Sequence, residues 1–283
     1  MEEIILKITA QHHGKTVKQI LDGHLKLSSR LISRLKVPGG ITVNGKNVTV
    51  RAILYENDIL KISPPARRSE NVIPVNIPID ILYEDDDILA VNKPQDMPVH
   101  PSLHNYRNTL GNAVMYHYGN PDMVYRAVTR LDRDTTGIVL IAKTQRAAAV
   151  LSKQLIAGKI IKTYYCITEN IPEPQCGEIN APIKRERESI IKRCVSPEGQ
   201  NALTRYEVLI AVQGCCLIKV QPVTGRTHQI RVHLSHIGCP LKNDFLYGSQ
   251  NDDAPFKLHC GSLEFYHPAS GERMIITCRA EFM

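Results

Sequence analysis

Residues 1–63 show short apolar runs separated by turn signals. Apolar residues recurring three and four positions apart predict two amphipathic helices, and β-branched runs beside them predict strands. Ser28 or Ser29 can cap the second helix, and an Asn44-Gly45 pair between two β-branched runs predicts a hairpin. The predicted elements are a strand at 4–9, helices at 15–25 and 29–37, a hairpin at 41–50 and a strand at 58–62.

The pattern changes after residue 63. Residues 64–77 begin with a proline-rich, charged stretch without apolar periodicity, which predicts a linker. Residues 78–283 then mix strand-like runs with helical periodicity, which indicates a second, larger domain. Its predicted elements are strands within 81–93, at 138–142, at 160–167 and at 258–267, and helices at 144–158 and 229–237.

A charged octet, Arg-Leu-Asp-Arg-Asp-Thr-Thr-Gly at 130–137, stands directly before the apolar run 138–142. The run is short, continuous and β-branched, which predicts a strand buried on both faces. Loops that such a strand holds in place often carry catalytic groups. Asp132 lies between Arg130 and Arg133, and nearby cations favour an ionised carboxylate. By itself the octet equally fits a polar turn with internal ion pairs.

Charge is distributed unevenly along the chain. Residues 1–70 hold 12 Lys/Arg and 6 Asp/Glu, whereas residues 71–283 hold 23 and 22. A basic segment ahead of a nearly neutral body suggests a polyanion-binding appendage on a separate catalytic domain. The eight cysteines form no Cys-x-x-Cys pair, and no apolar segment is long enough to cross a bilayer. A cytoplasmic location is therefore expected.

The octet resembles the catalytic motif of the RluA-type pseudouridine synthases, which isomerise uridine in structured RNA. Thr129 stands where that family usually has His, and Thr136 where it usually has Ser. Three further stretches, at 83–94, 224–234 and 258–268, are similar to the same family. They read Tyr-Glu-Asp-Asp-Asp-Ile-Leu-Ala-Val-Asn-Lys-Pro, Thr-Gly-Arg-Thr-His-Gln-Ile-Arg-Val-His-Leu and Leu-His-x-x-x-Leu-x-Phe-x-His-Pro.

The resemblance implies roles for individual residues. Asp132 would be the essential catalytic carboxylate, and Arg226 the basic partner that pairs with it and orients it. Tyr164 would stack on the target base and could take the C5 proton, and Arg130 would enter the RNA helix beside the flipped base. The carboxylate could attack the sugar C1′, attack the ring or remove the 2′ proton, and the sequence does not choose among these routes.

The base pocket is expected to include Ile230 and Leu258. Isomerisation oxidises, hydrolyses and adds nothing, and the sequence has no P-loop or nucleotide-binding glycine loop, so no cofactor is expected. His228, His233 and His236 lack a carboxylate or Cys at zinc spacing, so no metal is expected either.

Residues 14–63 resemble the S-four domain, a small RNA-binding domain found in a ribosomal small-subunit protein and in tyrosyl-tRNA synthetases. The segments "Ser-Ser-Arg-Leu-Ile-Ser-Arg-Leu" and "Ile-Thr-Val-Asn-Gly-Lys" carry most of the likeness. Arg30 and Arg34 are four residues apart and share one helix face, with Lys26 near its start. We expect these three residues to contact RNA, although a basic helix face alone is more often just solvated.

The sequence therefore predicts an α+β protein with three parts. These are an S-four-like RNA-binding domain (1–63), a linker (64–77) and a pseudouridine synthase domain (78–283) with a mixed, largely antiparallel sheet. The expected activity is uridine isomerisation in structured RNA, most readily ribosomal RNA, by a monomer with no membrane association. One alternative is a non-catalytic RNA-binding or ribosome-assembly factor on the same fold. Another is a glycoside hydrolase using Asp132 and Asp134 as its carboxylate pair.

Overall fold

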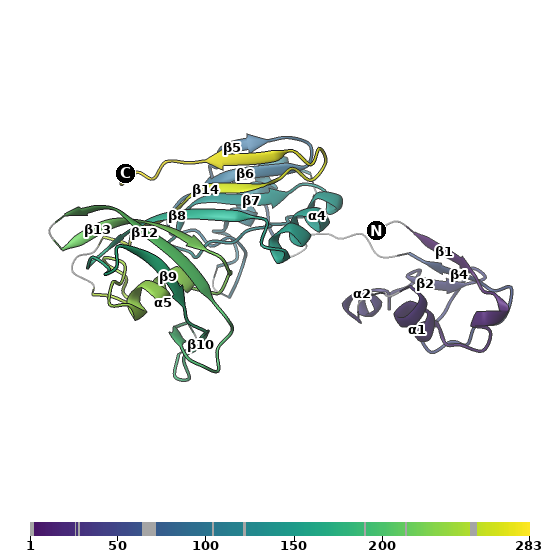
Figure 1. Cartoon of the computed structure of the whole chain (residues 1–283). Coiled ribbons are helices and arrows are strands. Elements are labelled where there is room, and N and C mark those ends of the chain that lie inside the picture. Colours follow the sequence, from purple (N-terminus) through teal and green to yellow (C-terminus); the bar gives the residue numbers. More distant parts are fainter. Residues whose placement is uncertain are drawn as a thin grey trace. The chain divides into compact units, whose positions relative to one another are not determined.

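The chain forms two compact units, Met1–Arg68 and Ser69–Met283, in a computed structural model (Figure 1). The structure describes residues 3–25, 27, 29–63, 72–103, 105–120, 123–189, 191–212, 214–249 and 254–283. Most of the predicted linker, residues 64–71, lies outside the described residues. Each unit has a hydrophobic core of its own.

The N-terminal unit is a four-stranded antiparallel sheet with helices on one side (Figure 1). Its strand order is β1-β4-β2-β3, and the Asn44-Gly45 turn between β2 and β3 has φ of +50° and +79°, as the hairpin signal predicts. The elements are β1 (Ile4–Lys7), α1 (Val17–Gln19), α2 (Ser29–Arg34), β2 (Ile41–Val43), β3 (Lys46–Asn47) and β4 (Ile59–Ile62).

The first predicted helix is divided in the structure. Thr16 caps α1 with a capping box, but α1 ends after three residues and continues as a π-helical turn over Ile20–His24. Ile20 and Leu21 still enter the core, together with Ile32 and Leu35 from α2. The apolar spacing therefore located the buried face, although it did not give the hydrogen-bond pattern.

The residues expected to contact RNA in this unit are placed only in part. Arg30 and Arg34 both belong to α2, and Arg34 is half-buried. Lys26 lies outside the described residues. Their RNA contact stays a prediction.

The C-terminal unit is built on a nine-stranded sheet of order β5-β6-β7-β14-β8-β13-β12-β9, with β15 paired to β14. Only β7 and β14 run parallel, so the predicted mixed, largely antiparallel sheet is confirmed. The strands are β5 (Asp80–Glu84), β6 (Ile88–Lys93), β7 (Thr136–Ala142), β8 (Ile161–Thr168), β9 (Cys176–Asn180), β12 (Leu203–Val212), β13 (Cys215–Pro222), β14 (Leu258–Tyr266) and β15 (Arg273–Thr277).

The other elements of this unit are few. The hairpin of β10 (Ile183–Arg185) and β11 (Arg193–Val195) stands apart from the main sheet (Figure 1). The helices are α3 (Leu110–Tyr118), α4 (Gln145–Ile156) and α5 (Gln229–His236). Within the described ranges, no helix combines the length and the apolar character needed to span a membrane.

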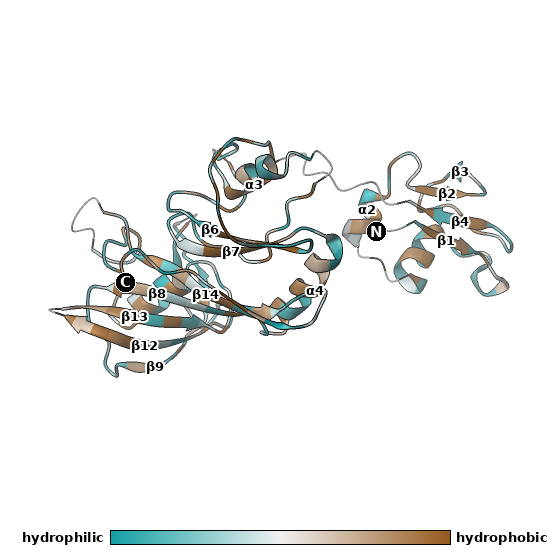
Figure 2. Cartoon of the chain, turned by 90° about the horizontal axis from the view of Figure 1, so that it is seen from above, coloured by the Kyte–Doolittle hydropathy of each residue, from teal (hydrophilic) through white to brown (hydrophobic). Residues whose placement is uncertain are grey.

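Strand β7 is the centre of the larger core. Its residues 138–142 are fully buried, and Figure 2 shows this strand coloured as hydrophobic. β7 pairs with β6 on one side and with β14 on the other, at the level of Gly137 and Cys260. Burial on both faces makes β7 a rigid support, so the charged octet at its start has a fixed position.

Candidate active site

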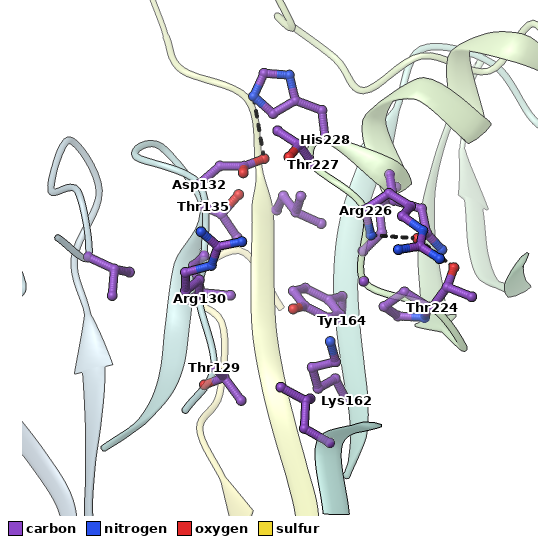
Figure 3. Close-up of a pocket in the computed structure, with 18 of the residues that line it drawn as sticks. Thr129, Arg130, Asp132, Thr135, Lys162, Tyr164, Thr224, Arg226, Thr227 and His228 are labelled. Atoms are coloured by element: carbon purple, nitrogen blue, oxygen red, sulfur yellow. Dashed lines mark hydrogen bonds and ion pairs between the residues drawn. The ribbon is translucent and has the colours of Figure 1, made fainter. Parts of the chain in front are cut away.

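The octet forms one wall of a cavity of about 630 Å³ in the C-terminal unit (Figure 3). Strand β8 forms its floor, and the turn 223–228 with the start of α5 forms the opposite wall. The volume falls in the range of small-molecule sites. Residues expected to act together from sequence line it jointly, namely Arg130, Asp132, Tyr164, Arg226, Ile230 and Leu258.

The octet loop is held by backbone and side-chain hydrogen bonds. The Thr129 hydroxyl accepts the Leu140 N–H at 2.9 Å, so the residue that replaces the family's usual His anchors the loop to β7. The Lys93 ammonium donates to the Arg133 carbonyl at 2.9 Å and to the Pro94 carbonyl at 2.6 Å.

Lys93 is fully buried below the octet, and this burial lowers its pKa to about 8. Asp134, Asp132 and Asp96 oppose that shift and raise the pKa. Sequence reasoning did not single out Lys93. Because a lysine is rarely buried without a structural partner, its place at the end of an otherwise apolar strand was the available signal.

Asp132 projects from the loop into the cavity with 30% of its side chain exposed. The Arg231 Nη1 lies 3.8 Å from its Oδ2, and the His228 Nε2 lies 4.0 Å away (Figure 3). The carboxylate is therefore accessible to a ligand from the cavity and faces cationic or N–H groups on its other side. This arrangement suits a carboxylate that acts in its ionised form.

Arg231 is fixed by contacts on three sides. Its Nε and Nη2 donate to the two oxygens of Asp244, each at 2.7 Å, and both side chains are buried. Its guanidinium also packs against the Tyr247 and Phe256 rings, 5.0 and 4.5 Å from their centroids. This bidentate pairing leaves Nη1 directed at Asp132.

Arg231, and not the expected Arg226, is the arginine that faces Asp132. Arg226 Nε donates to the Asn201 carbonyl at 3.0 Å, and Figure 3 shows Arg226 and Asp132 on opposite walls of the cavity. Among the described residues, the arginine within 4.0 Å of the Asp132 carboxylate is Arg231. The physical reason is position: Arg226 belongs to the turn before α5, whereas Arg231 lies on the helix face toward the octet. A catalytic role for Arg226 stays a prediction.

A sequence signal for Arg231 existed. It stands between Ile230 and Val232 in a helix whose apolar spacing predicts burial, and a buried arginine needs an anionic partner. The nearest acidic residue after it, Asp244, supplies that partner. Because Nε and Nη2 of Arg231 bind Asp244, only Nη1 remains to face the Asp132 carboxylate.

Tyr164 lies in the floor of the cavity, and the residue is only 6% exposed. Burial raises the pKa of Tyr164 well above its ordinary value, so the phenol is protonated at neutral pH. A protonated, rigidly held ring suits stacking on a base rather than proton removal. Ile230 and Leu258 line the same cavity, as expected for a base pocket.

Lys162 lies two residues before Tyr164 on the same face of β8 and also lines the cavity. Burial lowers the pKa of this lysine. Sequence reasoning did not assign Lys162 to the site. A half-buried cation next to the Tyr164 ring suits an anionic ligand such as a nucleotide.

Two of the three histidines considered as metal ligands, His228 and His233, have partners within the protein. Both ring nitrogens of His233 are used, one with the Thr204 hydroxyl at 2.8 Å and one with the Ala181 carbonyl at 2.9 Å. His228 faces Asp132 and Tyr247. Within the part of the chain that the structure describes, no three His, Cys, Asp or Glu side chains are grouped to hold a metal ion.

Comparison with known proteins identifies one family. The family model for RNA pseudouridylate synthase matches residues 87–236. The uncharacterized RNA pseudouridine synthase YjbO of Bacillus subtilis is 38% identical over 92% of this chain and 93% of its own length. The ribosomal large subunit pseudouridine synthase D of Pseudomonas aeruginosa is 34% identical over 96% of this chain and 89% of its own length. The protein of the same name from Pasteurella multocida is 36% identical over 83% of this chain and 78% of its own length.

Solved structures agree on the fold. Human RNA pseudouridylate synthase domain containing 1 superposes with a TM-score of 0.62 at 24% identity, over 73% of this chain and 85% of that chain. Human RNA pseudouridylate synthase domain containing 4 gives a TM-score of 0.58 at 25% identity, over 72% and 89%. This chain therefore belongs to the RNA pseudouridine synthase family, of the RluA type, and is an isomerase.

Proposed function

We propose that this enzyme isomerises uridine in ribosomal RNA and that Asp132 is its catalytic carboxylate. The reaction breaks the N1–C1′ bond, turns the uracil, joins C5 to C1′ and moves the C5 proton to solvent or to N1. The observation that carries the proposal is the position of Asp132. Its carboxylate enters a cavity of nucleotide-binding size above the Tyr164 ring, with Arg231 at 3.8 Å behind it.

The surrounding residues support base flipping. A uridine inside a helix must leave its stack before a protein group can reach C1′, at a cost of a few kcal/mol. Arg130 is exposed at the cavity, where its long side chain can fill the gap left in the helix. Tyr164 then receives the base, and Ile230 and Leu258 surround its edges.

Ribosomal RNA is the proposed substrate on two grounds. Two of the relatives that match this chain carry the name ribosomal large subunit pseudouridine synthase D. Residues 1–68 hold 12 Lys/Arg and 5 Asp/Glu, which suits a separate unit that binds a folded polyanion. We propose that the enzyme acts as a monomer in the cytoplasm, without a cofactor.

The deciding experiment compares Asp132→Asn with Asp134→Asn on ribosomal RNA transcripts. Asp134 lies two residues further along the octet and does not line the cavity, so it is a matched control. We expect the Asp132 variant to bind RNA with unchanged affinity and to form no pseudouridine, whereas the Asp134 variant stays active. Site-resolved pseudouridine mapping and RNA-binding titrations give the two readouts.

The outcome also separates the alternatives. If Asp132→Asn formed pseudouridine as fast as the wild-type protein, Asp132 would be excluded as the catalytic group. Absence of pseudouridine with wild-type protein, despite tight RNA binding, would favour a non-catalytic factor. A glycoside hydrolase that used Asp132 and Asp134 as a pair would form no pseudouridine. It would instead lose cleavage of the glycosidic bond in both variants.

A further inference from the structure

In the described part of the chain, His228 is the histidine that lies within 4.0 Å of the Asp132 carboxylate, and a hydrogen bond with Tyr247 fixes its ring. Its Nδ1 lies 2.8 Å from the Tyr247 hydroxyl oxygen. That oxygen also accepts the Arg193 backbone N–H at 2.9 Å. The result is a chain of groups that runs from the β11 backbone through Tyr247 and His228 to the carboxylate.

The direction of each hydrogen bond in this chain follows from proton counting. A backbone N–H can only donate, so the Tyr247 oxygen accepts from Arg193. The phenol has one proton of its own, and His228 Nδ1 is the acceptor that lies within reach of it. Burial raises the pKa of Tyr247 to about 12, so this proton is present at neutral pH. The tautomer that gives this phenol proton a partner is therefore the one in which His228 Nδ1 accepts.

The other ring nitrogen must then carry the imidazole proton. Burial lowers the pKa of His228; Asp132 and Asp244 raise it, whereas Arg231 and Arg193 lower it. The lowered pKa favours the neutral ring, which holds a single N–H. With Nδ1 accepting, that N–H is on Nε2, the nitrogen that faces Asp132 Oδ2.

The backbone at His228 also shows that its placement is constrained. His228 has φ of +56° and ψ of +19°, a left-handed conformation that residues other than glycine seldom adopt. It is the residue directly before α5, and this conformation directs its ring toward the octet. The turn that holds Tyr247 also holds Asp244, the partner of Arg231. One short turn therefore supports both groups that face Asp132.

We propose that Tyr247 sets the tautomer of His228 and that the resulting Nε2–H positions the Asp132 carboxylate for reaction. In this arrangement His228 and Arg231 both hold Oδ2, which leaves Oδ1 directed at the nucleotide. The 4.0 Å separation closes to a hydrogen bond when RNA fills the cavity, as catalytic hydrogen bonds commonly do on substrate binding. The assignment of His228 as a positioning residue rests on the proposed role of Asp132; the tautomer assignment does not.

The tautomer is tested on the free protein by nitrogen-15 NMR of histidine-labelled full-length chain at pH 7. We expect His228 to show a protonated Nε2 and an unprotonated Nδ1, with its signals identified by their loss in His228→Gln. Tyr247→Phe removes the phenol proton and should shift His228 toward a mixture of tautomers. The exposed Tyr266 supplies the control Tyr266→Phe, which should leave the His228 signals unchanged. A protonated Nδ1 in the wild-type protein overturns the assignment, whether or not the enzyme is active.

The positioning role is tested by single-turnover kinetics on RNA. A glutamine amide nitrogen reaches the place of Nε2, whereas an asparagine amide reaches only that of Nδ1. We therefore expect His228→Gln to retain about tenfold more of the rate than His228→Asn, because small displacements of a reacting group are costly. The KM for RNA should stay within about twofold in both variants, since the change affects the carboxylate and not RNA binding.

Two results would contradict the positioning role. Equal rate losses in His228→Gln and His228→Asn, with native circular dichroism, would show that the Nε2 donor is not what matters. Parallel rises in KM for RNA would assign His228 to binding instead. If the wild-type protein forms no pseudouridine at all, the proposed function fails while the NMR result still decides the tautomer.

Discussion

Arg226, in the turn before α5, and Arg231, in its first turn, have different environments and should behave differently when replaced. Arg231→Met leaves Asp244, which is fully buried, without its partner, so we expect a loss of about 3–5 kcal/mol in the free energy of unfolding. Arg226 is exposed and donates to a backbone carbonyl, so Arg226→Gln should change that free energy by less than about 0.5 kcal/mol. Urea denaturation measures both.

Activity separates the two arginines further. Arg231→Lys keeps a cation but loses the bidentate pair, so we expect it to fold and to lose single-turnover rate. Arg226→Gln should mainly raise the KM for RNA. If Arg226→Gln lost the chemical step while Arg231→Lys kept a rate near that of the wild type, the result would favour Arg226 as the partner of Asp132, as expected from the sequence motif.

At the scale of single residues, the sequence predicted which side chains gather in the cavity better than it predicted their partners. Asp132 and Tyr164 line one cavity because the motifs fix their places, Asp132 in the loop before β7 and Tyr164 within β8. Which of two arginines reaches the carboxylate depends on where α5 begins and how it is rotated. Those features depend on the αL residue His228 and on a turn more than ten residues away, which a local pattern does not contain.

At the scale of elements, the contact between β7 and β14 gives Gly137 its role in the octet. Gly137 has φ of +105°, and a Cβ there would lie 2.7 Å from the Cys260 nitrogen and closer still to its carbonyl oxygen. Gly137→Ala should therefore lower the free energy of unfolding by about 3 kcal/mol, through backbone strain and overpacking together. Gly158 at the end of α4 also has a positive φ, of +67°, but open space around it. Gly158→Ala should cost only about 1 kcal/mol.

Urea denaturation of the two alanine variants, with activity measured in parallel, checks this prediction. Displacement of β7 also moves Asp132, so Gly137→Ala should lose activity. Equal destabilisation of the two variants would mean that β14 moves to accommodate the added methyl group. The short distance between Gly137 and the Cys260 backbone would then not be the reason for glycine at position 137.

The elements that the sequence predicted are those with strong local signals. The strand that became β7, the helix α4 and the Asn44-Gly45 hairpin are all present. The parallel pairing of β7 with β14 was not predictable from pattern, because it joins residues about 120 positions apart. The π-helical turn after α1 was also missed, since the same apolar spacing suits either hydrogen-bond pattern.

At the scale of the whole molecule, the net positive charge is confined to the N-terminal unit. Residues 1–68 carry 12 Lys/Arg and 5 Asp/Glu, whereas residues 69–283 carry 23 of each. The larger unit contains both the cavity and a hydrophobic core of its own. Binding strength and chemistry should therefore separate between the two units, since phosphate neutralisation determines the salt dependence of affinity.

Deletion of residues 1–68 tests this separation. We expect residues 69–283 to fold, to bind ribosomal RNA more weakly and with a smaller salt slope, and to keep a single-turnover rate at saturating RNA within about threefold of the full chain. Affinity measured at several salt concentrations gives the slope, and circular dichroism of the truncated protein controls for folding. The same affinity and slope in both proteins would show that the N-terminal unit does not hold the RNA, and the basic charge would then need another explanation. A large loss of rate at saturating RNA would instead mean that this unit helps to place the target uridine in the cavity, so that binding and chemistry are coupled.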